Sequence, residues 1–525
     1  MLVQVCDACV QRYTPLGGNK AEIIPADGDL KREDNSDTVH PCCPLCFNLL
    51  SPSSACITNK TVKVVLEKPL LTPDMLKDGG LANPAATHPA EIASLSLESA
   101  VLQLKSEWTF EEFTVDLSLP AAFAVREQAA KWLLSDSCAP ISPSSTKDTL
   151  RSLLISQIEG ISGAVFNPCA SFKVQIKCEY EEEIDSEAEW LHGGVKKKSK
   201  KRKNRSHWNG SKEEKLPQMV GNGGANIIAK DYSLLSSAAT VLRLDEMSKD
   251  EFLQRCPLPV SSLSRPCTSN GVTLLIKGHR SPQYIGGRYL KVQRGLPQSP
   301  WVVGGVRKGE TSVQEELAAA ILPGAKADSY AFISSGREDI DVRMLGCGRP
   351  FALEVRNARV WPIPCQDLPS VTYGQFTRAH CNSGVYFALK SAQLTPENVT
   401  HLKMGEENKK KSYTAVCWAS NCVDYHVLCN RLPQSEFEIR QKTPLRVLHR
   451  RPNLDRCRII HQLSAKVLPG RPDGYFLLRL TTAAGTYVKE FINGDRGRTR
   501  PSLSDMLGCR VECVYLDVTA VHMEF

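Results

Sequence analysis

Apolar and polar residues between positions 91 and 180 follow the spacings of both helices and strands. From about Glu91 the apolar residues recur at helical spacing, and Pro89 stands just before them, so we expect a helix to begin there. Residues 110–119 (FEEFTVDLSL) alternate well enough to predict a strand, and residues 121–134 predict a second helix. This part of the chain is therefore expected to form an α/β module.

The second half of the chain is dominated by shorter apolar segments that are typical of strands. The segment 312–322 gives the clearest helical spacing. The expected strands are 272–277, 330–333, 385–389, 413–418, 444–448, 458–463, 475–481 and 511–518. Many short strands with few helices predict an α+β architecture with a mixed, largely antiparallel sheet.

A highly charged segment separates these two regions. Residues 179–189 are rich in acids, residues 196–205 are rich in lysine and arginine, and a glycine-rich stretch follows at 221–224. Such blocks cannot bury apolar area, so we expect a disordered insertion at about 180–230. Its basic run is typical of a nuclear import signal or an RNA-contacting tail, and equally of a solvated linker.

Composition and charge narrow the class of protein. The chain has 525 residues, of which 42% are hydrophobic and 23% charged, and no uncharged apolar run approaches the roughly 20 residues of a membrane helix. We also expect no secretory signal. Residues 276–525 contain 35 Lys and Arg against 23 Asp and Glu, which accounts for the net charge of +8 and favours a polyanionic partner such as nucleic acid.

Two cysteine pairs near the N-terminus have the spacing of a zinc site. The chain contains 20 cysteines, scattered as expected for a reducing compartment, but Cys6, Cys9, Cys43 and Cys46 form two CxxC pairs. Four thiolates close a tetrahedral zinc site and leave no open position for catalysis, so the predicted role is structural. The alternative is two unrelated thiol pairs.

The densest cluster of charged residues is the segment 334–343 (SSGREDIDVR). A carboxylate flanked by arginines is favoured in its ionised form, and the arginines can bind RNA phosphates. Alone, this pattern is usually a surface loop of ion pairs. Two further segments, 441–451 (QKTPLRVLHRR) and 484–491 (AGTYVKEF), change that interpretation.

These segments resemble the Pus Ten family of archaeal and eukaryotic tRNA pseudouridine synthases. The G-R-x-D element that ends at Asp339 is similar to the catalytic-aspartate motif of that superfamily, and residues 485–489 (GTYVK) are similar to the G-T-Y-[IV]-[RK] element of uridine-55 synthases. The resemblance covers about residues 277–525. It implies three parts, which are a zinc-binding segment with four cysteine ligands over 1–60, a THUMP-like RNA-binding domain over 90–275 and a pseudouridine-synthase domain over 276–525.

The resemblance also implies the chemistry, which is isomerisation of tRNA T-loop uridines 54, 55 or both without a cofactor for catalysis. Asp339 is the implied essential carboxylate, which either attacks the ribose anomeric carbon or removes a ribose proton to form a glycal. Tyr413 is expected to stack on the base and to handle the proton at carbon 5, and Lys489 to pair with the carboxylate. Val488 and Leu516 are the implied apolar walls.

A set of basic residues near these motifs is expected to bind the RNA. The set comprises Lys442, Arg446, Arg450, Arg451, Arg496, Arg498 and Arg500, and Arg337 and Tyr487 are further substrate-binding candidates. The bland alternative is that these arginines form ion pairs on the protein surface. Because the substrate would be tRNA, we expect an intracellular protein of the nucleus, the cytoplasm or both, which acts as a monomer without membrane contact.

Competing functions make different demands on the sequence. A THUMP-bearing thiouridine synthase needs an SGGxDS loop, and a THUMP-bearing methyltransferase needs an NPPY-type or DPPY-type tetrapeptide; the sequence contains neither. A non-catalytic, zinc-containing RNA-binding scaffold would also fit the positive charge of the second half. The combination of Asp339, Tyr413 and Lys489 argues against a scaffold.

Overall fold

The structure is a computed structural model that describes most of the chain after residue 90. The described residues are 3–5, 23–25, 61–67, 90–134, 145–180, 237–255, 272–363, 377–378, 384–391, 394–421, 424–468 and 474–523. The four predicted zinc ligands and nearly all of the predicted insertion at 180–230 lie outside them. Among the described helices, none is both long and apolar enough to cross a membrane.

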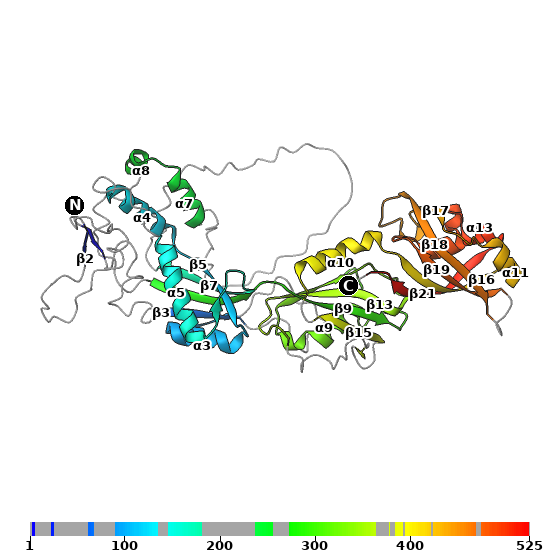
Figure 1. The fold of residues 1–525 in the computed structure, drawn as a ribbon, viewed down its shortest axis with the longest axis horizontal. Coiled ribbons are helices and arrows are strands. Elements are labelled where there is room, and N and C mark those ends of the chain that lie inside the picture. The colour runs from blue at the N-terminus through cyan, green and yellow to red at the C-terminus, as the bar shows by residue number, and fades with distance from the viewer. Residues whose placement is uncertain are drawn as a thin grey trace, which may run out of the picture. The chain divides into compact units, whose positions relative to one another are not determined.

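The chain divides into two compact units, which are taken one at a time here. The first unit comprises Met1–Leu66, Glu91–Ser106 and Glu111–Gly278, and the second comprises Glu67–Ala90, Glu107–Phe110 and His279–Phe525. Figure 1 shows the elements of both units, coloured from blue at the N-terminus to red at the C-terminus.

The first unit contains a six-stranded sheet with helices packed against it. The strand order is β4 (Ala90–Leu95), β3 (Thr61–Glu67), β8 (Val272–Arg280), β7 (Phe172–Tyr180), β5 (Glu112–Ser118) and β6 (Val165–Phe166). The described helices are α3 (Leu97–Glu107), α4 (Ala121–Leu134), α5 (Thr146–Ser162), α7 (Ser237–Asp245) and α8 (Lys249–Arg255). A separate parallel pair joins β1 (Val3–Val5) and β2 (Ile23–Pro25).

Three secondary-structure predictions for residues 91–134 of this unit can be compared with the structure, and two of them are confirmed. The expected strand at 110–119 is β5, and the expected helix at 121–134 is α4. The helix expected from Glu91 is wrong, because Ala90–Leu95 is strand β4 and α3 begins only at Leu97. The physical reason is a cap: the Ser96 hydroxyl accepts a hydrogen bond from the backbone N–H of Ser99, which starts the helix there.

The second unit is built on an eleven-stranded sheet. Its order is β14 (Thr377–Arg378), β15 (Val385–Ser391), β9 (Gln283–Lys291), β13 (Arg343–Arg356), β21 (Val511–Val521), β16 (Lys411–Ala419), β19 (Tyr475–Thr482), β18 (Asp455–Val467), β17 (Phe437–Lys442) and β20 (Thr499–Arg500), with β12 (Ser329–Ser334) also paired to β13. Strands β13 and β21 run parallel, and the other described pairs are antiparallel. The predicted mixed, largely antiparallel sheet is confirmed.

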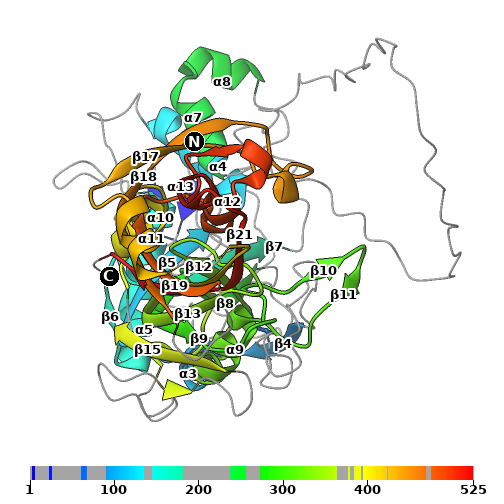
Figure 2. The ribbon, with the colours of Figure 1, turned by 90° about the vertical axis from the view of Figure 1, so that its right-hand side faces the viewer.

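A few short helices and one hairpin complete this unit. The helices are α9 (Val313–Ile321), α10 (Pro396–Asn408), α11 (Tyr425–Arg431), α12 (Val488–Asn493), α13 (Leu503–Leu507) and the 3-10 turns η3 (Pro323–Ala325), η5 (Leu445–Val447) and η6 (Asp495–Gly497). Helix α10 lies along the sheet (Figure 1), whereas the hairpin of β10 (Val302–Val303) and β11 (Val306–Arg307) extends away from it (Figure 2).

The strand predicted at 444–448 is wrong, because this segment forms part of a closed loop that contains η5. The backbone N–H of Thr443 donates to the Leu454 carbonyl at 2.8 Å, and the N–H of Leu454 donates to the Thr443 hydroxyl at 3.0 Å. These bonds close the chain on itself at the base of the loop. The segment therefore carries its side chains on a turn rather than on the sheet, and we call residues 443–454 the basic loop.

Candidate active site

One cavity of about 710 Å³ in the second unit collects the predicted site residues. Its wall is formed by the loop between β12 and β13, by β16 and β21, by the basic loop and by the turn that leads into α12. Ten of the predicted site residues line it, namely Arg337, Asp339, Tyr413, Arg446, Arg450, Arg451, Tyr487, Val488, Lys489 and Leu516. The structure thus brings together residues that the sequence separates by up to 179 positions.

The loop that carries Asp339 turns sharply at Gly336. This glycine has a φ of +85°, and a Cβ atom there would lie 2.8 Å from the Lys411 Nζ and 3.2 Å from the Arg349 Nη1. A larger residue would have to adopt a strained backbone and displace two cations. The glycine of the G-R-x-D element is therefore required by the geometry of the turn.

A buried network of hydrogen bonds holds the loop that carries Asp339. The Arg349 Nε donates to the Glu338 carboxylate at 2.8 Å, and both side chains are almost completely inaccessible. The Arg349 Nη1 donates to the Ser335 carbonyl at 2.7 Å, and the Tyr289 hydroxyl donates to Glu338 at 2.9 Å. Burial raises the pKa of Tyr289 well above its usual range, and the Glu338 charge adds to the effect. These bonds fix Glu338 inward, so that the next residue, Asp339, faces the cavity.

Lys291 fixes the same loop through its backbone. Its ammonium group, which is fully buried, donates to the carbonyls of Leu296, Asp339 and Ile340 at 2.8, 3.2 and 3.3 Å. Burial lowers the pKa of Lys291, although the nearby Glu338 carboxylate opposes that shift. Sequence analysis missed Lys291, because a single lysine at the end of a strand gives no local sign that it is buried.

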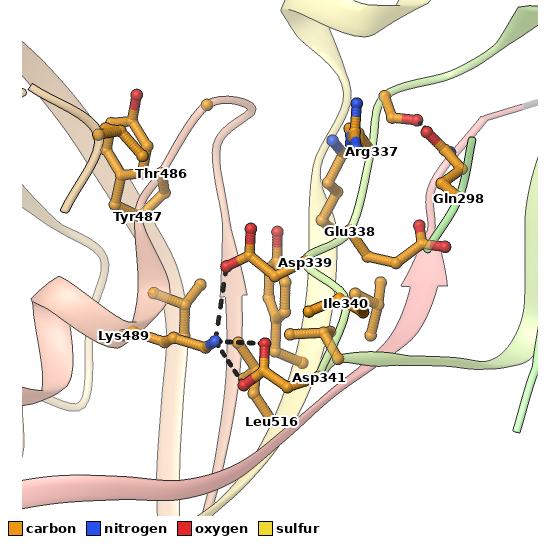
Figure 3. A pocket seen from close by; sticks show the side chains of 18 of the residues that line it. Gln298, Arg337, Glu338, Asp339, Ile340, Asp341, Thr486, Tyr487, Lys489 and Leu516 are labelled. Atoms are coloured by element: carbon orange, nitrogen blue, oxygen red, sulfur yellow. Dashed lines mark hydrogen bonds and ion pairs between the residues drawn. The ribbon is translucent and has the colours of Figure 1, made fainter. Parts of the chain in front are cut away.

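The Asp339 carboxylate lies between two cations from different elements. The Arg446 Nη1 of η5 is 3.1 Å from the Asp339 Oδ2, and the Lys489 Nζ of α12 is 3.5 Å from it. Lys489 is closer to Asp341, at 2.8 and 2.7 Å from the two carboxylate oxygens, as Figure 3 shows. Sequence analysis assigned Lys489 to Asp339 and Arg446 to RNA. It missed the contact of Lys489 with Asp341 and both carboxylate contacts of Arg446.

The two extra carboxylates are Asp341 and Glu490. The Arg446 Nε donates to the Glu490 Oε1 at 2.6 Å, and the Glu490 side chain is buried. Burial would raise the pKa of Asp341, but the hydrogen bonds and the charge of Lys489 outweigh it and lower that pKa below its usual value. Asp341 therefore remains charged near neutral pH.

Tyr413 and two apolar side chains form another part of the wall. A bulge in the pairing of β16 with β21 falls between Ser412 and Tyr413. Burial raises the pKa of Tyr413 to about 12, against the smaller effects of the Arg349 charge and a hydrogen bond with Thr482. The hydroxyl therefore keeps its proton at neutral pH. Val488 and Leu516 are 4% and 7% exposed and supply apolar surface.

The turn before α12 is held by an amide clamp. The backbone N–H of Tyr487 donates to the Gln441 Oε1, and the Gln441 Nε2 donates to the Tyr487 carbonyl, both at 3.0 Å. This clamp fixes the start of α12, which carries Val488 and Lys489 into the cavity. Val488 thus lies at the first position of a helix.

The predicted RNA-binding cations divide into two groups. Arg337, Arg450 and Arg451 are exposed and line the cavity. Arg498 instead fastens the basic loop, because its Nη2 donates to the Thr443 carbonyl and to the Asn453 Oδ1 at 2.8 and 2.9 Å. The residues that line this cavity do not include Lys442, Arg496 or Arg500. Among the described residues, no group of His, Cys, Asp and Glu side chains could hold a metal ion.

Comparison with known proteins shows which family this region is similar to. A family model described as "Pus10, C-terminal" matches residues 284–522. The chain is 36% identical over 294 residues to "tRNA pseudouridine synthase Pus10" of Homo sapiens, covering 56% of this chain and 53% of that protein. It is 36% identical over 249 residues to the protein of the same name from Thermofilum pendens, covering 47% and 54%.

A third relative, "Putative tRNA pseudouridine synthase Pus10" of Drosophila melanogaster, is 39% identical over 244 residues, covering 46% of this chain and 47% of the relative. The chain thus spans about half the length of the curated relatives it matches. Residues 284–522 are thus similar to the Pus10 C-terminal family, and the resemblance inferred from the G-R-x-D and G-T-Y-V-K elements is confirmed.

Proposed function

We propose that the chain is a tRNA pseudouridine synthase that isomerises T-loop uridines at position 54, 55 or both. The observation that carries this proposal is the cavity itself, in which a carboxylate, Asp339, lies between Arg446 and Lys489, and which a protonated tyrosine, Tyr413, also lines. It occurs in a region similar to a family whose curated members bear that name.

The Asp339 carboxylate would begin the reaction in one of two ways. As a nucleophile, it forms an ester bond with the ribose anomeric carbon while the bond from that carbon to uracil N1 breaks. As a base, it takes the neighbouring ribose proton while the same bond breaks, which yields a glycal. In both cases the electron pair leaves with uracil, and the Arg446 and Lys489 cations can stabilise the resulting anion.

The detached uracil must then turn without leaving the cavity and bond through carbon 5 to the anomeric carbon. In the nucleophilic route the ester bond to Asp339 breaks as this bond forms, and in the glycal route Asp339 returns the proton to the ribose. Val488 and Leu516 offer apolar surface to the base, and Tyr413 offers a ring on which it can stack. Because its pKa of about 12 keeps the hydroxyl protonated, Tyr413 is a poor base. It would take part in loss of the carbon 5 proton only as a relay that releases its own proton as it accepts another.

Recognition of the tRNA would combine phosphate contacts with base flipping. The T-loop uridines lie inside a folded loop, where side chains cannot reach the glycosidic bond unless the nucleotide turns out. Arg337, Arg450 and Arg451 are exposed at the cavity and suited to the flanking phosphates. The Pro297 and Trp301 side chains also line the cavity and extend its apolar surface.

The remaining parts of the proposed enzyme would serve binding and stability. Cys6, Cys9, Cys43 and Cys46 would hold one structural zinc ion, because four thiolates close its coordination shell. Residues 90–275 would form the THUMP-like RNA-binding domain and residues 276–525 the catalytic domain. The protein would act as a monomer inside the cell, in the nucleus, the cytoplasm or both.

Release of tritium tests this function directly. The full chain is incubated with an unmodified tRNA transcript that carries tritium at carbon 5 of its uridines, because isomerisation must release that atom to water. We expect release of about one or two equivalents per tRNA, one for each T-loop position that is modified. No release from tRNA transcripts at saturating protein would refute the proposal and favour an RNA-binding scaffold.

A further inference from the structure

Three carboxylates and two cations form one continuous chain of contacts on the cavity wall. In order of contact they are Glu490, Arg446, Asp339, Lys489 and Asp341. Figure 3 shows the end at which the Lys489 ammonium group reaches both aspartates. With all five groups ionised, the chain of contacts carries one negative charge that no member of it compensates.

The contact lengths show which carboxylate each cation lies closer to. Arg446 lies 2.6 Å from Glu490, and Lys489 lies 2.7 Å from Asp341, whereas the two contacts of Asp339 measure 3.1 and 3.5 Å. Charge attraction weakens with distance, and a hydrogen bond at 3.5 Å is marginal. Each cation therefore interacts more strongly with its outer carboxylate than with Asp339.

We propose, on the basis of the function proposed above, that Asp341 is a positioning residue for the isomerisation: it holds Lys489 off Asp339 and so keeps the Asp339 carboxylate reactive. A cation that lay fully on Asp339 would make it a weaker nucleophile and a weaker base. Glu490 restrains Arg446 in the same way from the other side. Both cations remain close enough to meet the charge that develops when uracil leaves.

Two further cations near Asp339 are occupied elsewhere. Lys291 of β9 donates to the backbone carbonyl of Asp339 and not to its carboxylate, and Arg349 of β13 is paired with Glu338. The other titratable or charged side chains that line the cavity are Arg337, Lys411, Tyr413, Arg450, Arg451 and Tyr487. The closest charged contacts to the Asp339 carboxylate thus remain those of Arg446 and Lys489.

The pH dependence of the Asp341→Asn variant tests this role. Without the second carboxylate, Lys489 is free to pair fully with Asp339, which would then stay ionised to lower pH but react more slowly. We expect a single-turnover rate about tenfold lower at saturating tRNA, with the acidic limb of its pH profile about one unit below that of the unchanged protein. Tritium release from the transcript gives the rate at each pH.

Two variants separate this effect from a general loss of structure. Asp341→Glu keeps the charge and is expected to restore the rate to within about threefold of the unchanged protein. Asp455→Asn removes an exposed carboxylate that contacts only Arg440 among the described ion pairs and does not line the cavity, so its rate and profile should stay unchanged.

The outcomes distinguish the positioning role from the proposed function. If the unchanged chain releases tritium and the limb of Asp341→Asn stays in place or moves to higher pH, the positioning role is overturned and the function stands. If Asp341→Asn is inactive while Asp339→Asn reacts, the roles of the two aspartates are reversed and the inference is wrong. If the unchanged chain releases no tritium, both the positioning role and the proposed function are refuted.

Discussion

Glu338 and Asp339 are neighbouring acids that the fold places in opposite environments. Glu338 is buried against Arg349, whereas the Asp339 side chain remains 38% exposed in the cavity. The sequence shows acids in a row, but a loop has no regular alternation that would tell which of them faces inward. The resemblance to the G-R-x-D motif singled out Asp339. The contact of Asp341 with Lys489 joins residues 148 positions apart, and no local pattern predicts it.

Replacement of Asp339 tests its chemical role. Asp339→Asn should lower the isomerisation rate at least about a hundredfold, because the amide neither attacks the ribose nor accepts its proton. Affinity for tRNA should remain nearly unchanged, since it comes chiefly from phosphate contacts made elsewhere. Tritium release and a filter-binding titration measure the two quantities. Full activity of this variant would mean that the motif has been assigned to the wrong residue.

Loss of the Glu338 charge tests the buried support of the loop. Glu338→Gln leaves the Arg349 guanidinium buried without its counter-charge, and we expect the free energy of unfolding to fall by about 3 to 5 kcal/mol. Denaturant unfolding of the full chain, followed by intrinsic fluorescence, measures the change. Glu354→Gln is the matched control: its partner Arg356 is exposed, so a change of less than about 1 kcal/mol is expected. Equal effects of the two variants would contradict a supporting role.

At the scale of elements, local patterns predicted the strands in which buried and exposed positions alternate. They did not predict the structure of segments whose conformation depends on contacts with distant residues. Strands β5, β16 and β19 show the expected alternation of buried and exposed positions, at least in part. The basic loop contains apolar residues as well, but the bonds between Thr443 and Leu454 and those from Arg498 turn it away from the sheet. Strand β13 was missed because its centre is buried on both faces and shows no alternation.

At this scale, we predict that the exposed cations of the basic loop contribute to tRNA binding. Arg450→Ala together with Arg451→Ala should weaken tRNA binding and reduce the magnitude of its log-log salt slope by about 1.4 to 1.8, because two phosphate contacts are lost. The rate at saturating tRNA should change little. Titrations at several salt concentrations give the slope, and single-turnover tritium release gives the rate.

A double variant elsewhere on the surface provides the control. Arg356→Ala with Arg510→Ala also removes two exposed cations, each of which contacts a glutamate and neither of which lines the cavity. Its salt slope should match that of the unchanged protein. If both double variants behave alike, the arginines of the basic loop form surface ion pairs only, and the RNA must follow another path.

For the whole molecule, hydrophobic patterns along the sequence do not show which distant residues share the cavity. The last segment of the first unit ends at Gly278, and the last segment of the second unit begins at His279. This boundary lies close to the point where the composition changes from mixed to basic. The cavity, however, combines side chains from Pro297 to Val518. Only similarity to a family could relate such distant motifs before the fold was known, because hydrophobic periodicity describes neighbours along the chain.

The predicted zinc site is a further feature at the scale of the whole molecule. Because the two CxxC pairs lie far from the catalytic motifs in the sequence, we expect one zinc ion per chain with a structural role. Cys6→Ser or Cys43→Ser should lose the metal and destabilise its surroundings, and a chelator should impair folding or RNA binding before the chemistry. Elemental analysis of freshly purified protein measures the content. A protein without stoichiometric zinc would refute the site.

The most direct test of the central claim is to map pseudouridine in the product. Unmodified tRNA transcript is incubated with the unchanged chain or with Asp339→Asn, treated with carbodiimide, and read by primer extension, which stops at each modified pseudouridine. The proposed function predicts stops at T-loop position 54, 55 or both with the unchanged chain, and none with the variant. Identical stop patterns from the two proteins, or no T-loop stop from the unchanged chain, would contradict it.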